Sequence, residues 1–322
     1  MAALKIGFII DPIETIRPDE DSTYLFMLEA QRRGHEIFYM TVPDLFMKGN
    51  RPGASGVRLE VFRDKEYYRL GKKKTLDLNG FDILFMRKDP PFNLEYYTAT
   101  LILERVNPST LVINDPKGLR NNNEKASTLR FPGLTPETLI THRIDQLQRF
   151  LDDVGGEMIV KSLFRSYGRE VLYVNREGMN CNTLLEMATR DETRFVMAQR
   201  YLYEAADGDK RIILLNGEPV GAVLWLPPEK YGDKPPIRTP WREVKTELTE
   251  RERFVCETIA PHLKENGLYF AGIDMIGGYL TEINITSPTC LHEINRLNHV
   301  HLEEKVIDFA EEEQRRRAAS GR

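Results

Sequence analysis

The chain has 322 residues, and its 45 basic and 49 acidic side chains nearly balance, giving a formal net charge of −4. Binding to nucleic acid would call for a basic stripe, so this balance argues against a nucleic-acid partner. The composition, 41 % hydrophobic and 29 % charged, is typical of a soluble globular protein, and the length allows two or three lobes with sizeable cores.

The cysteines and the first residues predict a cytoplasmic protein. Cys181, Cys256 and Cys290 form no C-x-x-C pair and cannot make an even disulfide framework, which favours a reducing compartment. The apolar run at residues 4–10 is broken by Asp11 and is too short for a signal peptide or a membrane span. We therefore expect no contact with a membrane.

The first lobe is predicted to alternate strands and helices. Strands are expected at residues 4–10, 35–42, 81–87 and 111–114, and helices at 22–33 and 96–105. Ser22 can cap the first helix, and Gly34 can end it. This alternation favours a parallel sheet covered by helices on both faces. In such sheets the loops at the carboxyl ends of the strands carry the ligand chemistry, which indicates residues 11–21 and 87–91.

The second half is predicted to contain hairpins and two longer helices. Strands are expected at residues 158–161, 171–174, 195–202, 210–215, 269–276 and 280–286, and the first helix at 144–154. Asn216-Gly217 is the strongest short hairpin signal in the chain. Thr249 followed by Glu252 is a capping box that opens the second helix, which ends at residues 266–267.

Other parts of this half carry weaker signals. The proline-rich residues 227–240 predict a loop. The charged residues 311–322 predict a solvated helix end that frays. His262, His292 and His299 show no ligand spacing, so we expect them to be structural or exposed. No internal repeat is visible.

The most informative segment is F-A-G-I-D-M-I-G-G-Y-L-T-E-I-N at residues 270–284. Glu282 and Asn284 share one face, because side chains alternate along a strand. Carboxylates on opposite strands repel by roughly 0.2–1 kcal/mol unless a cation neutralises them. Mg²⁺ would do so, since it takes a few carboxylates together with phosphate oxygens and water. An exposed polar face of an ordinary hairpin is the alternative, but the flanking apolar residues favour a bound partner.

Whether Asp274 joins this group depends on the turn. A two-residue turn at 277–278 would pair Asp274 with Thr281 and leave Glu282 on the other face. A three-residue turn at 277–279 pairs Asp274 directly with Glu282. We predict the three-residue turn, because it gathers three oxygen ligands on one face.

This hairpin resembles the metal-binding strand pair of the prokaryotic glutathione synthetase family. Other stretches match that family in the same order: K-I-G-F-I-I-D-P-I-E at the start, L-E-A-Q-R-R-G-H-E at 28–36, F-M-R-K-D-P-P-F at 85–92, N-E-K-A-S at 123–127 and D-G-D-K-R-I-I-L-L-N-G-E-P-V at 207–220. The resemblance implies an α/β protein with the ATP-grasp fold and an N-terminal parallel α/β lobe. It implies a substrate lobe at 1–122, a central lid lobe at 123–205 and a C-terminal lobe with the metal site at 206–322.

The activity that this resemblance implies is an ATP-dependent ligation of γ-glutamylcysteine to glycine through an acyl-phosphate. ATP and Mg²⁺ are the implied cofactors, and the family's members are commonly homo-oligomers. Two alternatives stay open. One is a related ATP-grasp ligase with an altered substrate, and the other is a non-catalytic protein that lost phosphate transfer.

The resemblance also implies roles for single residues. The implied metal ligands are Asp274, Glu282 and Asn284. The implied ATP contacts are Lys125, Lys161, Gln199, Tyr201, Leu202, Asp209 and Lys210. The implied substrate contacts are Arg87, Ser287, Pro288 and Thr289, and Arg211 is the implied catalytic residue that steadies the acyl-phosphate. Lysine suits phosphate because it is a compact charge with three donors, although a solvated surface lysine is the alternative.

Three departures from the family pattern lie around the implied phosphate site. Where the family has P-L-x-G-x-G-G, residues 162–170 read S-L-F-R-S-Y-G-R-E, with a single glycine. Trp225 stands where the family carries an arginine, and the following loop lacks the R-x-N-x-x-x-G-G pattern. Loss of one preorganised charge costs ~10²–10³ in rate, which keeps the alternatives open. Arginines that could compensate in part are Arg165, Arg169 and Arg238.

Overall fold

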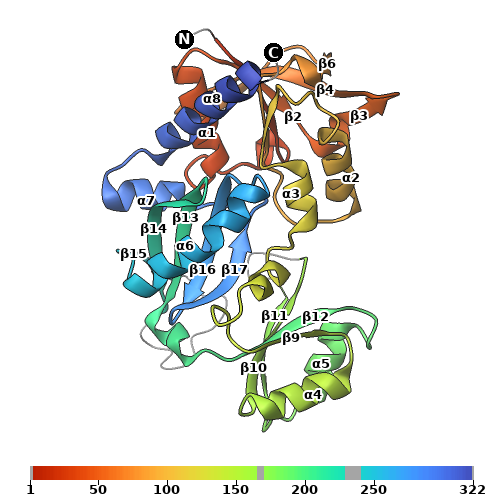
Figure 1. Cartoon of the computed structure of the whole chain (residues 1–322), viewed down its shortest axis with the longest axis vertical. Coiled ribbons are helices and arrows are strands. Elements are labelled where there is room, and N and C mark those ends of the chain that lie inside the picture. The colour runs from red at the N-terminus through yellow and green to blue at the C-terminus, as the bar shows by residue number, and fades with distance from the viewer. Residues whose placement is uncertain (1–2, 165–169, 229–240, 321–322) are drawn as a thin grey trace.

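The structure is a computed structural model that describes residues 3–164, 170–228 and 241–320. The described residues form three sheets, which follow one another along the long axis of the molecule (Figure 1). The N-terminal sheet lies at one end and a small lobe around the second sheet lies at the other, with the third sheet between them. Among the described helices, none is long and apolar enough to cross a membrane.

The N-terminal sheet is mixed, whereas the sequence predicted a parallel one. Its parallel strands are β1 (Lys5–Ile9), β2 (Glu36–Met40), β7 (Ile83–Met86) and β8 (Leu111–Ile113), in the order β2-β1-β7-β8. Antiparallel strands that were not predicted extend it: β3 (Leu45–Lys48), β4 (Arg51–Val61), β5 (Tyr68–Leu70) and β6 (Lys74–Asp77). The four predicted strands are thus present, and they form the parallel part of the sheet.

Helices cover both faces of this sheet, as predicted. They are α1 (Ser22–Arg32), α2 (Leu94–Leu103) and α3 (Pro116–Asn121), with single turns at η1 (Ile13–Thr15), η2 (Val42–Asp44) and η3 (Leu78–Gly80). Ile6 and Phe8 pack with α1, while Leu84 and Met86 pack with α2 and α3. Strands buried on both faces read as continuous apolar runs, which explains why β1 and β7 were easy to predict.

The cap of α1 differs from the prediction by one residue. Asp21, not Ser22, is the N-cap: its Oδ1 accepts hydrogen bonds from the backbone N–H of Thr23 at 2.7 Å and of Tyr24 at 3.0 Å. Ser22 Oγ instead accepts a hydrogen bond from the backbone N–H of Leu291 at 3.3 Å. A carboxylate is as good a cap as a hydroxyl, so a local pattern could not choose between these neighbours.

The second sheet and two helices form the central lobe, which is central in the sequence but lies at one end of the molecule (Figure 1). Its strands are β9 (Thr138–Thr141), β10 (Glu157–Ser162), β11 (Val171–Asn175) and β12 (Val196–Arg200), all antiparallel in the order β11-β10-β12-β9. Helices α4 (Ile144–Asp153) and α5 (Cys181–Thr189) pack on it, and η4 (Ala126–Arg130) precedes it. Strand β9 and helix α5 were not predicted. The core of the lobe is its own, built around Leu147, Met158 and Leu185.

The third sheet carries the hairpins that the sequence predicted. Its order is β15-β14-β13-β16-β17, with β13 (Asp209–Leu215), β14 (Glu218–Leu226), β15 (Arg242–Lys245), β16 (Phe270–Ile276) and β17 (Tyr279–Asn284). The η5 turn (Tyr203–Asp207) precedes it, and α6 (Glu250–Glu265) and α7 (Leu291–Asn298) pack against it. Asn216 and Gly217 form the two-residue turn with φ of 49° and 77°, as predicted. The capping box of Thr249 and Glu252 is also confirmed.

The first and third sheets form one body. Asn114, at the end of β8, donates hydrogen bonds from Nδ2 to the carbonyl oxygens of Phe270 and Ile285, both at 2.7 Å. Its Oδ1 accepts the N–H of Phe270 at 2.8 Å. The Phe270 ring in turn meets the ring of Phe26 edge to face, with centroids 5.2 Å apart. We call this unit, residues 3–122, 208–228 and 241–320, the body.

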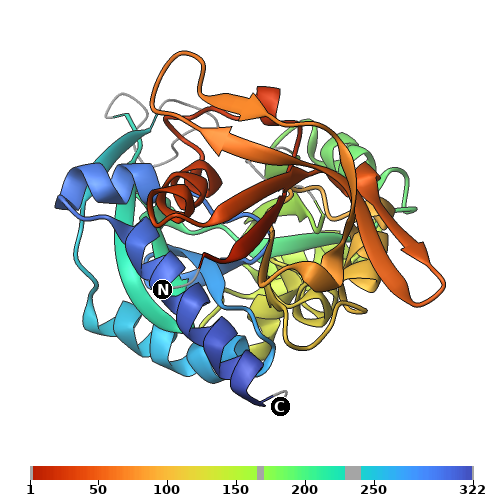
Figure 2. The same ribbon diagram turned by 90° about the horizontal axis from the view of Figure 1, so that it is seen from above.

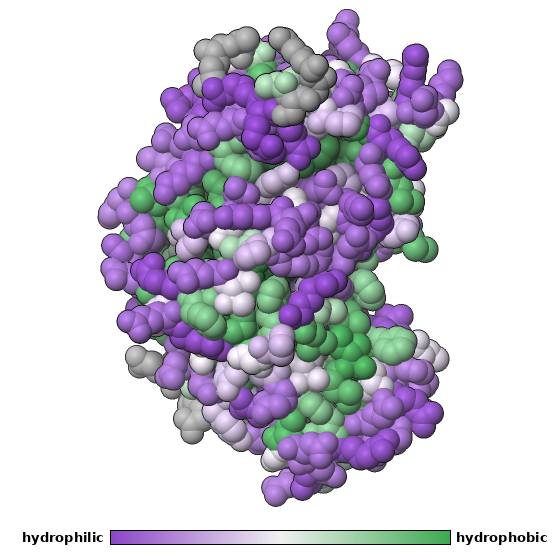
Figure 3. Space-filling model, in the orientation of Figure 1, coloured by the Kyte–Doolittle hydropathy of each residue, from purple (hydrophilic) through white to green (hydrophobic). Residues whose placement is uncertain are grey.

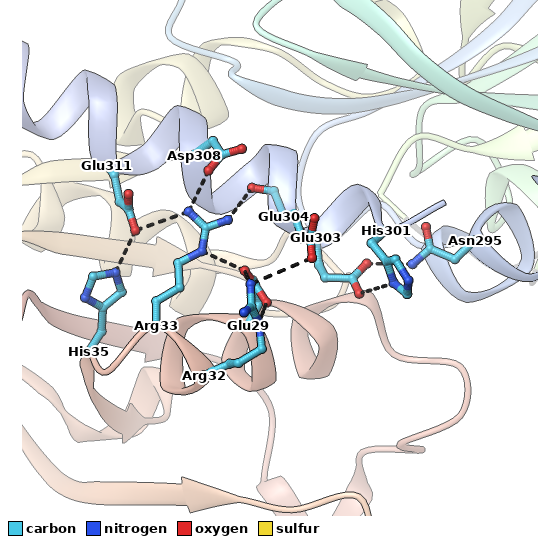
Figure 4. Close-up of polar contacts among 10 residues, drawn as sticks. All are labelled: Glu29, Arg32, Arg33, His35, Asn295, His301, Glu303, Glu304, Asp308 and Glu311. Atoms are coloured by element: carbon cyan, nitrogen blue, oxygen red, sulfur yellow. Dashed lines mark hydrogen bonds and ion pairs between the residues drawn. The ribbon is translucent and has the colours of Figure 1, made fainter. Parts of the chain in front are cut away.

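The last helix, α8 (Leu302–Ser320), returns to the N-terminal sheet and lies alongside α1 (Figures 1 and 2). The predicted helix end at 311–322 does not fray as far as residue 320, and only part of it is solvated: Glu312, Arg315 and Arg316 are exposed, whereas Glu313 and Gln314 are buried. Glu311 is only 2 % exposed, and its Oε1 lies 2.8 Å from His35 Nε2 and 3.3 Å from Arg33 Nη1 (Figure 4). Ion pairs of Glu304, Asp308 and Glu311 with Arg32 and Arg33 secure α8 on α1.

Candidate active site

A cavity of about 760 Å³ lies between the third sheet and the central lobe. The surface is hollowed on one side between the body and that lobe, and hydrophobic side chains gather around the hollow (Figure 3). Many of the residues singled out from the sequence line the cavity: Lys125, Lys161, Gln199, Tyr201, Leu202, Asp209, Arg211, Asp274, Glu282, Asn284, Ser287, Pro288 and Thr289. Residues far apart in the chain are thus brought to one place.

The hairpin β16–β17 pairs Asp274 directly with Glu282, as predicted, but the predicted turn is wrong. The turn has two residues, since Ile276 pairs with Tyr279. A β-bulge next to Asp274 restores the pairing, with Thr281 as the extra residue on β17. Its Oγ1 donates to the carbonyl oxygen of Asp274 at 3.1 Å, which fixes the bulge.

A row of polar side chains crosses three strands of the sheet. Arg211 of β13 pairs with Asp274 of β16, which pairs with Glu282 of β17. Arg211 holds the Asp274 carboxylate through Nε on Oδ1 and through Nη2 on Oδ2, the latter at 2.8 Å. Asn284 Nδ2 donates to the same Oδ2 at 3.1 Å, which leaves its amide oxygen for another partner. The two-point contact with Arg211 fixes the direction of the Asp274 carboxylate.

Two lysines reach this row from the other side of the cavity. Lys125 Nζ donates to Glu282 Oε1 at 2.8 Å, and Lys161 Nζ donates to the carbonyl oxygen of Thr281, in the bulge, at 3.1 Å. The pKa of Lys161 is lowered to about 8, mainly by burial, which Glu282 opposes and the positive charge of Lys125 assists. A buried ammonium group of this kind gains by meeting an anion.

Asp209 is a buried acceptor beside this row. It pairs across the sheet with Trp225, so both side chains share the face that lines the cavity. Burial raises the pKa of its carboxyl to about 8, and the charge of Asp274 adds to the rise. Oδ1 of Asp209 has no hydrogen-bond partner among the described residues. A buried polar atom without a partner indicates a place for a polar ligand atom.

Lys210, which the resemblance implied as an ATP contact, points the other way. Neighbouring side chains on a strand lie on opposite faces, so Lys210 turns away from the face of Asp209 and Arg211. Its Nζ donates to Glu252 Oε2 at 2.8 Å and to the carbonyl oxygen of Glu247 at 3.0 Å. Lys210 therefore supports the start of α6, and the interpretation of this residue as an ATP contact is corrected.

Arg87 supports the turn at 287–289, where the resemblance implied substrate contacts, instead of lining the cavity. Its Nε donates to Thr23 Oγ1 at 3.0 Å and its Nη2 to the carbonyl oxygen of Pro288 at 2.7 Å. The guanidinium lies 5.5 Å from the ring of Phe26 and 5.2 Å from the ring of Phe270. Arg87 does not line the cavity, whereas Pro288 does, so Arg87 supports the turn from behind.

Parts of the predicted phosphate-covering segments lie outside the described residues. These are 165–169 and 229–240, and with them Arg165, Arg169 and Arg238. Trp225 and Trp241 both line the cavity, so the predicted departure at Trp225 reaches the site. His262 contacts Asn122 at 2.8 Å and is structural, as expected.

The residues that line the cavity fit a metal-bound nucleotide. No group of three His, Cys, Asp or Glu side chains that could hold a metal alone occurs among the described residues. Mg²⁺ needs no such cage, because it takes one or two carboxylates and completes its shell with phosphate oxygens and water. Asp274, Glu282 and the amide oxygen of Asn284 supply oxygen donors, and Lys125 and Lys161 supply positive charge for phosphates. Antiparallel sheets that close on such a site define the ATP-grasp class of proteins.

Comparison with known families and proteins agrees. Residues 4–120 match the model of the prokaryotic glutathione synthetase N-terminal domain, and residues 124–299 match that of the prokaryotic glutathione synthetase ATP-grasp domain. The glutathione synthetase of Gloeobacter violaceus is 42 % identical over 314 residues, covering 95 % of this chain and 96 % of that protein. That of Synechocystis sp. is 41 % identical over 323 residues, covering 96 % and 100 %. The chain belongs to the prokaryotic glutathione synthetase family and is an ATP-dependent ligase.

Solved structures with little sequence similarity share the fold. D-cycloserine synthetase DcsG is 15 % identical with a TM-score of 0.66, over 97 % of this chain and 99 % of that one. The ATP-grasp ligase PsnB is 17 % identical with a TM-score of 0.63, over 96 % and 98 %. The D-alanine–D-alanine ligase of Bacillus anthracis is 14 % identical with a TM-score of 0.59, over 99 % and 100 %. These likenesses confirm the predicted ATP-grasp fold.

Proposed function

We propose that this chain is a glutathione synthase, which joins γ-glutamylcysteine to glycine at the expense of ATP, with Mg²⁺ as cofactor. The observation that carries this proposal is the row of Arg211, Asp274 and Glu282, which lines one cavity together with Lys125 and Lys161. The membership of the chain in this family supports the same activity. Oxygen donors, cations and a nearby backbone turn are the groups that this chemistry requires.

In the proposed reaction the terminal carboxylate of the peptide takes the γ-phosphoryl group of ATP, and the amine of glycine then displaces phosphate. Bound Mg²⁺ would offset the negative charge on the phosphates. Lys125 and Lys161 hold the phosphate oxygens, and Arg211 steadies the acyl-phosphate. Such catalysis depends on positioning and on charges fixed in advance, because the transferred group needs little covalent help from the protein.

The remaining residues of the cavity would bind the rest of the ligands. Gln199, Tyr201 and Leu202, at the end of β12, would border the adenine, and Asp209 would accept a hydrogen bond from the nucleotide. The turn at 287–289 would meet the peptide and the amino acid. Arg87 has an indirect part in this account, because it holds the carbonyl oxygen of Pro288.

A second candidate is a related ATP-grasp ligase with a changed substrate. Trp225 favours it, since an indole lines the cavity where the family pattern carries an arginine. An aromatic wall suits an apolar or flat group better than it suits a carboxylate. The two candidates share the phosphate site and differ only in the acceptor or the peptide.

The setting of the enzyme is also proposed. We infer a cytoplasmic location from the cysteine pattern. We infer that the chain forms a homo-oligomer because the members of the family commonly do so. We also propose the division into lobes at 1–122, 123–205 and 206–322. The separate core of the central lobe supports its two boundaries, at 122/123 and at 205/206. The return of α8 to α1 joins the first lobe to the third.

The test is a reaction with ATP, Mg²⁺, γ-glutamylcysteine and glycine, in which released phosphate is measured and the product is identified by mass. We expect equal amounts of phosphate and glutathione, and loss of both when glycine or Mg²⁺ is left out. Lys264→Met, on the exposed side of α6, is the control and should behave as the wild type. Phosphate release with another amine but not with glycine would favour the second candidate. No phosphate release with any substrate pair would contradict the proposal.

A further inference from the structure

Three consecutive residues at the start of the segment that leads from the body to the central lobe each contact a different part of the molecule. Asn123 Nδ2 donates to the carbonyl oxygen of Leu163, at the end of β10, at 2.8 Å. Lys125 Nζ donates to Glu282 Oε1 at 2.8 Å. Glu124, between them, also lines the cavity but was not singled out from the sequence. Its contacts give it a part of its own.

Glu124 lies along the exit of β17 and binds it with both its side chain and its main chain. Its Oε1 accepts the N–H of Ile285 at 2.9 Å, the N–H of Thr286 at 3.0 Å and the hydroxyl of Thr286 at 2.8 Å. Its carbonyl oxygen accepts the N–H of Ile283 at 2.8 Å. One residue therefore holds the backbone on both sides of Asn284.

This arrangement matters because β17 ends at Asn284 and the chain leaves the sheet there. A residue at the end of a strand has lost the ladder that fixes its neighbours further along. Glu124 replaces that ladder, and the carbonyl oxygen of Ile285 is held separately by Asn114 Nδ2 at 2.7 Å. The amide of Asn284 is consequently directed at Asp274, to which it donates at 3.1 Å.

The contacts are strong enough for this part. One carboxylate oxygen that accepts three donors is a charge-assisted arrangement, and such bonds are about twice as strong as neutral ones. Burial raises the pKa of the Glu124 carboxyl, and the charge of Glu282 raises it further. A buried carboxylate beside another is unfavourable by itself, so its presence here is explained by what it holds.

We infer that Glu124 is a positioning residue for the metal site: it brackets Asn284 and so sets the oxygen donors of β17 in place for Mg²⁺. It does not contact the metal. Partners that orient metal ligands typically change metal affinity by roughly 10- to 100-fold when they are removed. This inference rests on the proposed function, since it assigns a part in the same metal and nucleotide site.

The test is a calorimetric titration of ADP into the full chain with and without Mg²⁺, for the wild type, Glu124→Ala and Glu124→Gln. The ratio of the two dissociation constants measures how much the metal helps. We expect Glu124→Ala to reduce this ratio by roughly 10- to 100-fold and to leave the metal-free constant within about twofold. Glu124→Gln keeps an oxygen acceptor for the three donors, so its ratio should stay within about threefold of the wild type.

Glu252→Ala is the matched control, because Glu252 is another buried carboxylate that accepts a backbone N–H, that of Thr249, on the opposite face of the same sheet. We expect it to lower the melting temperature and to leave the ratio unchanged. If Glu124→Ala does not fold, Glu124→Asp, which withdraws the carboxylate by one methylene, should reduce the ratio in the same direction.

The outcomes separate the inference from the proposed function. A wild-type ratio near one would contradict the proposed function itself. A clear wild-type ratio that Glu124→Ala leaves unchanged would overturn the inference. An equal loss in Glu124→Gln and Glu124→Ala would also overturn it, because charge and not positioning would then be the cause.

Discussion

The body and the central lobe are built in different ways. Two of the hydrophobic clusters among the described residues run through both sheets of the body, so that Met86 of β7 shares one with Ile212 of β13. The third cluster contains only residues of the central lobe, such as Leu147 and Leu185. The body is therefore packed as a unit across distant parts of the chain, whereas the lobe has a core of its own (Figure 1).

This difference divides the site into two halves. Asp274 and Arg211 belong to the body, where they are bound to each other and to their neighbours. Lys161 and Gln199 belong to the lobe and meet the body across the cavity. Lobes with separate cores can close over a ligand as units. We therefore expect changes in the body half to act on stability as well as on rate, and changes in the lobe half to act on rate alone.

The largest effect is expected from Asp274→Asn in the body. Arg211 would keep its buried charge and lose its ionic partner, which destabilises a protein by about 3–5 kcal/mol. Urea unfolding followed by circular dichroism measures this change. Asp145→Asn, an exposed ion-pair residue on α4, is the control and should unfold as the wild type does. A change below about 1 kcal/mol for Asp274→Asn would show that this ion pair does not hold the body together.

Lys161→Met, in the central lobe, should change the rate and not the stability. The rate of phosphate release should fall by ~10²–10³, because a fixed charge at the transferred phosphate is lost. The melting temperature should not fall, since burial already disfavours the charged form of this lysine and methionine has a similar length. Steady-state kinetics and thermal unfolding on the same sample check both parts. A large drop in melting temperature with normal kinetics would reverse the division between body and lobe.

Arg33→Met is expected to weaken only one edge of the body. Arg33 donates to carboxylates of Glu29 and Asp308, and its removal should cost about 1.5–3 kcal/mol, as for hydrogen bonds to charged groups. Hydrogen exchange should show faster opening of α8, with the amides of the central lobe unchanged. Faster exchange in the lobe as well would mean that the two parts are more tightly coupled than their separate cores indicate.

The smallest effect concerns pH. The pKa of Lys161 is lowered to about 8 and that of Asp209 is raised to about 8. As the pH rises from 7 to 9, Lys161 loses its positive charge and Asp209 becomes negative, and both changes disfavour a triphosphate. Affinity for ATP should therefore fall above pH 8 by up to about tenfold per pH unit. Lys161→Met and Asp209→Asn should each flatten this profile, and a flat wild-type profile would contradict it.

The sequence predicted the register of the β16–β17 hairpin but not the turn and bulge that produce it. The pairing of Asp274 with Glu282 was inferred from a three-residue turn, whereas the chain uses a two-residue turn and a bulge at Thr281. Both solutions shift the register by one residue, so a local pattern cannot distinguish them. The bulge is held by Thr281 Oγ1 on the carbonyl oxygen of Asp274 and by Lys161 on the carbonyl oxygen of Thr281, and the second of these contacts comes from a remote part of the chain.

Other errors have equally physical reasons. The sequence alone could have excluded Lys210 as an ATP contact, since Asp209 and Arg211 on the same strand must face the other way. The part played by Arg87 could not have been found in that way, because its partners Thr23 and Pro288 lie 64 and 201 residues away in the chain. Strands β3–β6 lie beyond the parallel core, where exposed and buried positions mix and no period stands out.

A crystal structure of the chain with ADP and Mg²⁺ tests the central claim most directly. We expect one metal about 2.0–2.1 Å from oxygens of Asp274, Glu282 and Asn284, with the phosphates on Lys125 and Lys161. A metal bound elsewhere, or a nucleotide outside the cavity between the third sheet and the central lobe, would contradict it.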